Sequence, residues 1–207
     1  KNPLTPMKLT LQQLQRTITE KSDNGSQGIQ RPINNLLHQI DTLSDIATSF
    51  SSFAKMPIPE NERFDLVSCL RKTLGIYKNS KEASIHYTEN VSEVSVIGDE
   101  QLTSRIISNI IINSLQSASE ERDLEIDVSI DIREDGNKVV ISIADNGVGI
   151  PEEAHSKVFV PNFSTKDTGS GIGLAIAKHG IEHAGGTIWF ESSPEGTIFY
   201  IELPVSL

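Results

Sequence analysis

Apolar residues near the beginning of the chain recur at alternating intervals of three and four residues. In the first segment they are Leu4, Met7, Leu11, Leu14 and Ile18. After the polar stretch "KSDNGSQG", the same alternation runs through Ile33, Leu36, Ile40, Leu43, Ala47, Phe50 and Ala54. Such spacing places one apolar stripe along each of two helices. The pattern therefore predicts an antiparallel helical hairpin, with Pro32 in the first turn of its second helix.

The apolar face of this hairpin is wide, because Leu37, Ile46 and Phe53 flank its second stripe. A lone hairpin cannot cover such a face, which favours pairing with a second copy into a dimeric four-helix bundle. The alternative, two core helices of one larger domain, stays open. The stiff sequence "MPIP" at 56–59 favours a separate module. We therefore expect two domains, the hairpin over residues 1–56 and a second domain over 57–207.

The pattern after this linker is mixed. The sequence "FDLVSCLRKTLGIY" predicts a helix with Asp65 as its N-cap, and "SIHYTEN" and "VSVIGD" predict short strands. The alternating apolar residues of "EIDVSIDIRED", followed after the turn "GNK" by "VVISIAD", predict an antiparallel pair, and "GTIWFES" and "GTIFYIEL" predict another. Two further helices are expected at about 100–118 and 172–184. This order predicts an α+β fold, a two-layer α/β sandwich whose helices cover one face of a mixed sheet.

Composition narrows the class of protein. The chain has 207 residues, 37% apolar and 22% charged, which is typical of a soluble globular protein. We expect neither a membrane segment nor a signal peptide in this sequence, since no apolar run approaches the required length. The net charge of −10 argues against non-specific nucleic-acid binding. The single cysteine, Cys69, excludes an internal disulfide and is expected to be buried in packing.

Two polar motifs interrupt the apolar elements. Asn109 and Asn113 are four residues apart, so they share one face of the helix expected at 100–118. Taken alone, they fit satisfied core amides. In "ADNGVGIP", Asp145 ends a strand and is followed by Gly147 and Gly149, which by itself fits an ordinary turn.

A third motif places glycines at alternate positions directly before a helix. Gly169, Gly171 and Gly173 in "TGSGIGL" are typical of backbone that approaches phosphate. A dinucleotide fold would require a strand just upstream, and the polar "VPNFSTKDT" there argues against one.

Together these pieces resemble the ATP-binding domain of the GHKL superfamily, which includes type II topoisomerases, heat-shock chaperones, mismatch-repair ATPases and bacterial histidine kinases. "NIIINSLQSA" is similar to its N box, "DNGVGI" to its first glycine box, "VPNFSTK" to its F box and "TGSGIGL" to its second glycine box. The resemblance covers about residues 62–204 and implies binding of ATP with Mg²⁺.

The resemblance also assigns roles. Asp145 should accept a hydrogen bond from the exocyclic amine of adenine, Asn113 should ligate Mg²⁺, and Lys166 should reach the terminal phosphates. The implied ATP-binding residues are Asn109, Asn113, Asp145, Gly147, Gly149, Ile150, Lys166, Gly169, Ser170, Gly171, Ile172, Gly173 and Leu174.

One position separates hydrolases from kinases within the superfamily. The hydrolytic members carry a glutamate, the general base, where this chain has Asn109. An amide cannot accept a proton, which leaves the γ-phosphoryl group for another acceptor. This chain resembles histidine kinases there, although it has Gln116 where many of them have lysine.

The hairpin resembles the same class. "KNPLTPMKL" is similar to the end of the phosphoacceptor motif "HEIKNPLTPMKL" of nitrogen-regulation sensor kinases. The acceptor histidine would then lie three residues before Lys1, and Asn2 would be one turn after it, where an amide is implicated in dephosphorylating the regulator. The motif matches none of the histidines that are present, His38, His86, His155, His179 and His183.

The expected function is therefore that of the cytoplasmic core of a bacterial sensor histidine kinase. It would transfer the γ-phosphoryl group of ATP to a hairpin histidine and then to an aspartate of a response regulator, as a homodimer, without nucleic acid or membrane contact by this chain. The full-length protein could be anchored in the inner membrane. Two alternatives stay open: a GHKL ATPase that couples nucleotide to conformational change, and a non-catalytic nucleotide-sensing dimerisation module.

Overall fold

The structure is a computed structural model that describes residues 59–78, 80, 82–119, 122–161, 163–164 and 171–206 and, nearer the start, 9, 11–12, 33–34, 36–37 and 40. Those early residues are helical. The helix pairing and the four-helix bundle predicted for residues 1–56 lie outside the described residues. The chain divides into two units, Lys1–Pro57 and Ile58–Leu207.

The second unit contains the helices and strands named here. In chain order they are β1 (Glu62–Asp65), α3 (Leu66–Gly75), β2 (Ser84–Glu89), β3 (Ser95–Gly98), α4 (Glu100–Leu115), β4 (Glu125–Ile132), β5 (Lys138–Asp145), the 3₁₀ helix η1 (Glu152–Lys157), α5 (Gly173–His183), β6 (Thr187–Ser193) and β7 (Gly196–Pro204). The two strand pairs and the three helices predicted beyond the linker are all present. The short elements β1 and η1 were not predicted.

Aspartate side chains begin the first two of these helices. The carboxylate of Asp65 accepts hydrogen bonds from the backbone N–H groups of Val67 and Ser68, both at 3.1 Å, before α3. Asp99 accepts one from Leu102 N at 2.9 Å before α4. These bonds satisfy donors that a helix leaves unpaired in its first turn, typically worth about 1 kcal/mol each. The predicted N-cap at Asp65 is confirmed.

Five strands form the main sheet in the order β2-β4-β5-β7-β6. β2 runs parallel to β4, and the other neighbours are antiparallel. β1 and β3 form a separate antiparallel pair. Since β5 and β7 are adjacent in the centre of the sheet, the end of β5 lies beside the start of β7, with Asp145 opposite Thr197.

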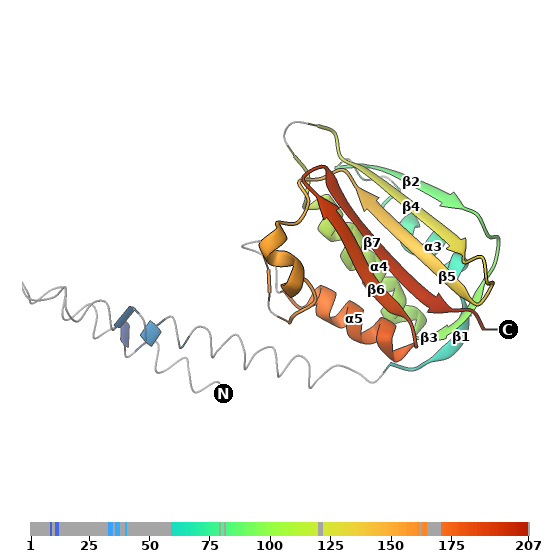
Figure 1. The fold of residues 1–207 in the computed structure, drawn as a ribbon, viewed down its shortest axis with the longest axis horizontal. Coiled ribbons are helices and arrows are strands. Elements are labelled where there is room, and N and C mark those ends of the chain that lie inside the picture. The colour runs from blue at the N-terminus through green and yellow to red at the C-terminus, as the bar shows by residue number, and fades with distance from the viewer. Residues whose placement is uncertain are drawn as a thin grey trace, which may run out of the picture. The chain divides into compact units, whose positions relative to one another are not determined.

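Helices α3, α4 and α5 all lie on one face of the five-stranded sheet, as Figure 1 shows. The core lies between these two layers, because every second residue of β4, β5 and β7 is buried there. The largest fully buried side chains are Leu66, Leu70, Ile106, Ile107, Ile110, Ile111, Ile126, Ile130, Ile141, Ile143, Ile181 and Ile201. The predicted two-layer α+β sandwich is confirmed.

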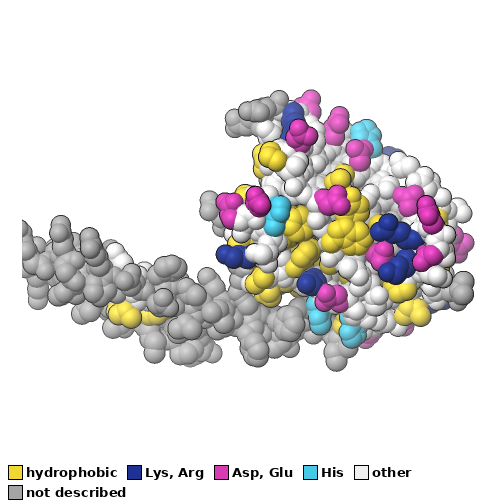
Figure 2. All heavy atoms as spheres, in the orientation of Figure 1, with side chains coloured by type: hydrophobic (Ala, Val, Ile, Leu, Met, Phe, Trp, Pro, Cys, Tyr) yellow, Lys and Arg dark blue, Asp and Glu magenta, His cyan; other side chains and the backbone are white. Residues whose placement is uncertain are grey.

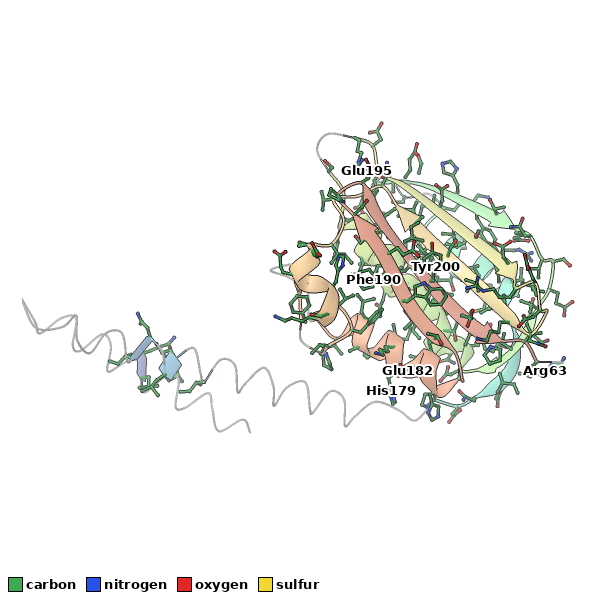
Figure 3. All side chains as sticks on the ribbon, in the orientation of Figure 1. Arg63, His179, Glu182, Phe190, Glu195 and Tyr200 are labelled. Atoms are coloured by element: carbon green, nitrogen blue, oxygen red, sulfur yellow. The ribbon has the colours of Figure 1, made fainter. Side chains whose placement is uncertain are left out.

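The other face of the sheet carries a small aromatic cluster among charged side chains. Trp189 of β6 stacks on Tyr200 of β7, with ring centroids 5.0 Å apart and an interplanar angle of 15°. Figure 3 labels Tyr200 on this face, and Figure 2 shows hydrophobic side chains gathered over β6 and β7. Beside them Glu202 pairs with Arg133 and Lys138.

The single cysteine lies in the core layer, as predicted. Cys69 of α3 is 2% exposed, and burial raises the pKa of its thiol to about 11. It therefore stays a neutral packing group at physiological pH. Among the helices of the described part of the chain, none combines the length and apolar character of a membrane-spanning segment.

Candidate functional site

A cavity of about 670 Å³ opens between α4, the turn after β5 and the beginning of α5. It brings together side chains from segments far apart in the sequence. Of the residues singled out by the sequence motifs, it is lined by Asn109, Asn113, Asp145, Gly149, Ile150, Gly171, Gly173 and Leu174. Lys166, Gly169 and Ser170 lie outside the described residues, as does Asn2.

Asp145 lies at the end of β5 and is only 9% exposed. Its Oδ2 accepts a hydrogen bond from Ser114 Oγ at 2.8 Å. Its Oδ1 accepts another from the backbone N–H of Gly147 at 3.0 Å. Ser117 Oγ lies 3.1 Å from the same oxygen and shares its one hydrogen between Asp145 Oδ1 and Ser114 O, which is 2.7 Å away. These contacts fix the orientation of the carboxylate at the wall of the cavity.

Ser114 and Ser117 were not singled out from the sequence. They come from the C-terminal end of α4 and the turn that follows it, and they meet Asp145 only because α4 packs against the end of β5. Their spacing of three residues on an amphipathic helix was a weak signal. A serine at such a position is equally consistent with solvent exposure.

The glycines of the first glycine box have neighbours that the sequence could not indicate. A Cβ at Gly147 would lie 1.9 Å from Ser117 Oγ, and a Cβ at Gly149 would lie 1.9 Å from the carbonyl oxygen of Ser193. Gly149 also has φ of +72°, which side chains rarely adopt. The close approach at these two glycines is thus to the protein's own chain. Gly149 lines the cavity as well, whereas Gly147 lies behind it and supports Asp145.

The two asparagines of α4 lie one helical turn apart and both line the cavity, as their spacing predicted. Asn109 faces the beginning of α5, where a Cβ at Gly173 would lie 3.3 Å from its Nδ2. The second glycine box and the N box are therefore adjacent in space. A Cβ at position 173 would require the Asn109 side chain to shift by a few tenths of an ångström.

The beginning of α5 borders the same cavity. Ile172 precedes the helix and supplies no side-chain cap, and Gly171 before it has φ of +62°. The unpaired N–H groups of a helix N-terminus, together with its dipole, favour an anion. Both Gly171 and Gly173 line the cavity.

A buried carboxylate and a helix N-terminus therefore line the same cavity. Residues 98–207 match the family described as histidine kinase-, DNA gyrase B-, and HSP90-like ATPases. The chain belongs to this family. The fold and the superfamily expected from the motifs are confirmed.

Curated relatives of the chain come from bacteria, and one of the two described here is named a kinase. The nitrogen regulation protein NtrY of Azorhizobium caulinodans is 29% identical over 98% of this chain and 27% of its own length. Sporulation kinase B of Bacillus subtilis is 29% identical over 100% of this chain and 47% of its own length. The chain thus spans between about a quarter and half of these relatives.

Solved structures of histidine kinases share the fold of the second unit. The catalytic domain of histidine kinase ThkA matches with a TM-score of 0.62 and 26% identity, covering 70% of this chain and 97% of that domain. The mycobacterial sensor histidine kinase MprB matches with a TM-score of 0.61 and 25% identity, covering 70% and 97%.

Proposed function

We propose that this chain is the ATP-dependent catalytic core of a sensor histidine kinase. The observation that carries the proposal is the buried Asp145 carboxylate, which accepts hydrogen bonds from Ser114 Oγ and Gly147 N–H at the wall of a cavity that both asparagines of α4 also line. The family and the kinase relatives support the same activity.

The proposal places adenine against Asp145. An ionised carboxylate accepts hydrogen bonds, and the exocyclic amine of adenine donates one. Guanine has a carbonyl oxygen at that position, so two acceptors would oppose each other. Gly149 and Ile150 would lie beside the base, with Gly147 behind the carboxylate.

The phosphates are placed toward the beginning of α5. Its backbone N–H groups favour negative charge, and the glycines at 171 and 173 leave room for close approach. From the resemblance, the other residues of this part of the site are Lys166, Gly169, Ser170, Ile172 and Leu174, with Gly169, Gly171 and Gly173 as the hinge and floor of a lid.

A Mg²⁺ ion fits the donors that are present. Within the described ranges, no three His, Cys, Asp or Glu side chains form a group that could hold a metal. Asn113 lines the cavity and carries an amide oxygen, and Mg²⁺ bound with nucleotide commonly takes few protein ligands, completing its octahedron with water and phosphate. When bound, the ion supplies charge neutralisation of the phosphates.

Asn109 favours transfer over hydrolysis. It lies where a base would activate water in the hydrolytic members, and an amide cannot accept that proton. The γ-phosphoryl group is then available to a histidine of the helical hairpin and afterwards to an aspartate of a response regulator.

The remaining parts of the proposal concern assembly. We place the hairpin, residues 1–56, in a homodimer, with residues 57–207 as the ATP-binding domain and Asn2 as a residue for regulator dephosphorylation. A solved structure holds the histidine kinase ThkA in complex with the response regulator TrrA, and we propose a partner of that class here. The core would act in the bacterial cytoplasm, with any membrane anchor elsewhere in the full-length protein.

Calorimetry with Mg-ADP and Mg-ATP tests the central assignment. We expect Asp145→Ala and the isosteric Asp145→Asn to weaken binding about ten- to a hundredfold, because a buried charged acceptor is lost. The matched control is Asp131→Asn, since Asp131 also accepts hydrogen bonds from two side chains but lies on β4 away from the cavity. Wild-type affinity in both Asp145 variants would refute the adenine assignment.

A further inference from the structure

The turn that follows Asp145 is tied to two other segments of the chain. On one side is the loop after α4, where Val148 N donates to Ser117 O at 2.9 Å and Asn146 Nδ2 donates to Asp123 O at 3.1 Å. On the other side is the turn between β6 and β7. There Ile150 N donates to Ser192 Oγ at 2.8 Å.

The backbone of the turn after Asp145 also lies directly against the backbone at the β6–β7 turn. A Cβ at Gly149 would meet the carbonyl oxygen of Ser193, and a Cβ at Gly196 would lie 1.9 Å from the carbonyl oxygen of Asp145. Figure 3 labels Glu195 in this turn. The three segments therefore form one packed unit beside the cavity.

Arg122 joins all three segments. It belongs to the loop after α4, and its Nη2 donates to Gly147 O at 2.7 Å and to Glu195 O at 3.1 Å. Its contact with Gly147 is the shortest of the ties described here. A charged donor makes a stronger hydrogen bond than a neutral one.

The peptide unit that Arg122 holds is the one next to the carboxylate. Gly147 C=O and Val148 N–H belong to the same peptide plane, so Arg122 and Ser117 O fix its two ends. The preceding amide, Gly147 N–H, donates to Asp145 Oδ1. A glycine peptide without these ties is free to rotate, because glycine allows a wide range of backbone angles.

We propose that Arg122 is a positioning residue for nucleobase recognition. Through Gly147 and the β6–β7 turn, it holds the Asp145 carboxylate in the orientation that receives the adenine amine. This inference rests on the proposed adenine site and extends it to a residue outside the four sequence boxes. It predicts that loss of Arg122 weakens the binding of the nucleobase and leaves the binding of the phosphates unchanged.

The test measures the affinity of the 207-residue chain for two ligands. Mg-ADP affinity is obtained by calorimetry, and Mg-tripolyphosphate affinity by displacement of a fluorescent nucleotide. We expect Arg122→Ala to weaken Mg-ADP about three- to tenfold and to leave Mg-tripolyphosphate unchanged. The Mg-ADP affinity of Arg122→Lys should lie between those of the unaltered chain and Arg122→Ala. A lysine ammonium can donate to one carbonyl oxygen but lacks the planar, forked set of donors of a guanidinium group.

The matched control is Arg133→Ala. Arg133 is also exposed and carries the same charge, but it pairs with Glu202 at the β4–β5 end of the sheet. Hydrogen exchange provides a readout independent of affinity: the amides of residues 147–150 should exchange faster in Arg122→Ala and not in Arg133→Ala.

The outcomes separate this inference from the function on which it rests. If the unaltered chain binds no Mg-ADP, the proposed function fails, and the inference with it. If it binds Mg-ADP and Arg122→Ala binds equally well, or loses both ligands alike, the positioning role alone is overturned.

Discussion

At the residue scale, Asn109 and Asn113 have the same side chain on the same face of α4, yet the proposal gives them different tasks. Asn109 lies against Gly173 at the beginning of α5, so its position is set by contact between two helices. Asn113 lies one turn further along α4, next to Ser114, which donates to Asp145, and the proposal assigns its amide oxygen to the metal ion. The difference in task comes from what each amide faces.

This difference predicts a metal-dependent defect. Asn113→Ala should weaken nucleotide binding about tenfold in Mg²⁺, about 1.4 kcal/mol, and by much less in EDTA, because it removes a metal ligand and no base contact. Calorimetry with ADP in both buffers measures the effect. Asn137→Ala, an exposed asparagine between β4 and β5, is the control and should change neither value. Equal weakening in both buffers would contradict the role of Asn113 as a ligand.

At the element scale, stability depends on how closely the turns approach one another. Gly149 and Gly136 both have φ of +72°, but only Gly149 faces another segment, with Ser193 O at 1.9 Å from a Cβ there and nothing within 4 Å at Gly136. Gly136→Ala should cost about 1–2 kcal/mol of unfolding free energy for the backbone angle alone. Gly149→Ala should cost more, above about 3 kcal/mol, since a backbone carbonyl must also move. Urea unfolding compares them, and equal losses would show that the close approach relaxes freely.

The elements themselves were largely predictable, and the links between them were not. Periodicity and an N-cap such as Asp65 act within a few residues, so the local sequence carries them. The parallel pairing of β2 with β4 depends on distant segments, and β1 is only four residues long. Local sequence was likewise sufficient for only part of the site. The glycines and Asp145 belong to recognisable motifs. Ser114, Ser117 and Arg122 acquire their roles only when α4 and its following loop pack against the end of β5.

At the scale of the whole molecule, the proposed kinase needs a phosphoacceptor as well as a nucleotide. His155 Nε2 donates to Ile150 O at 2.9 Å, and the ring packs edge-on against Phe190. His179 and His183 lie one turn apart on α5. These contacts fit structural roles, and the motif that the first residues resemble places the acceptor three residues before Lys1.

The last prediction follows from that placement. The 207-residue chain should bind ATP without gaining an acid-labile phosphoryl label, whereas a chain extended at its beginning by His-Glu-Ile should gain one, stable in alkali, when incubated with radiolabelled Mg-ATP. An extension by Gln-Glu-Ile keeps the length and removes the imidazole, so it should stay unlabelled. In the His-Glu-Ile chain, Asn2→Ala should leave labelling intact and slow dephosphorylation of the regulator, because an amide positions water by hydrogen bonding and takes no part in the first transfer. Labelling of the unextended chain would contradict the proposal, since one of its own five histidines would then be the acceptor.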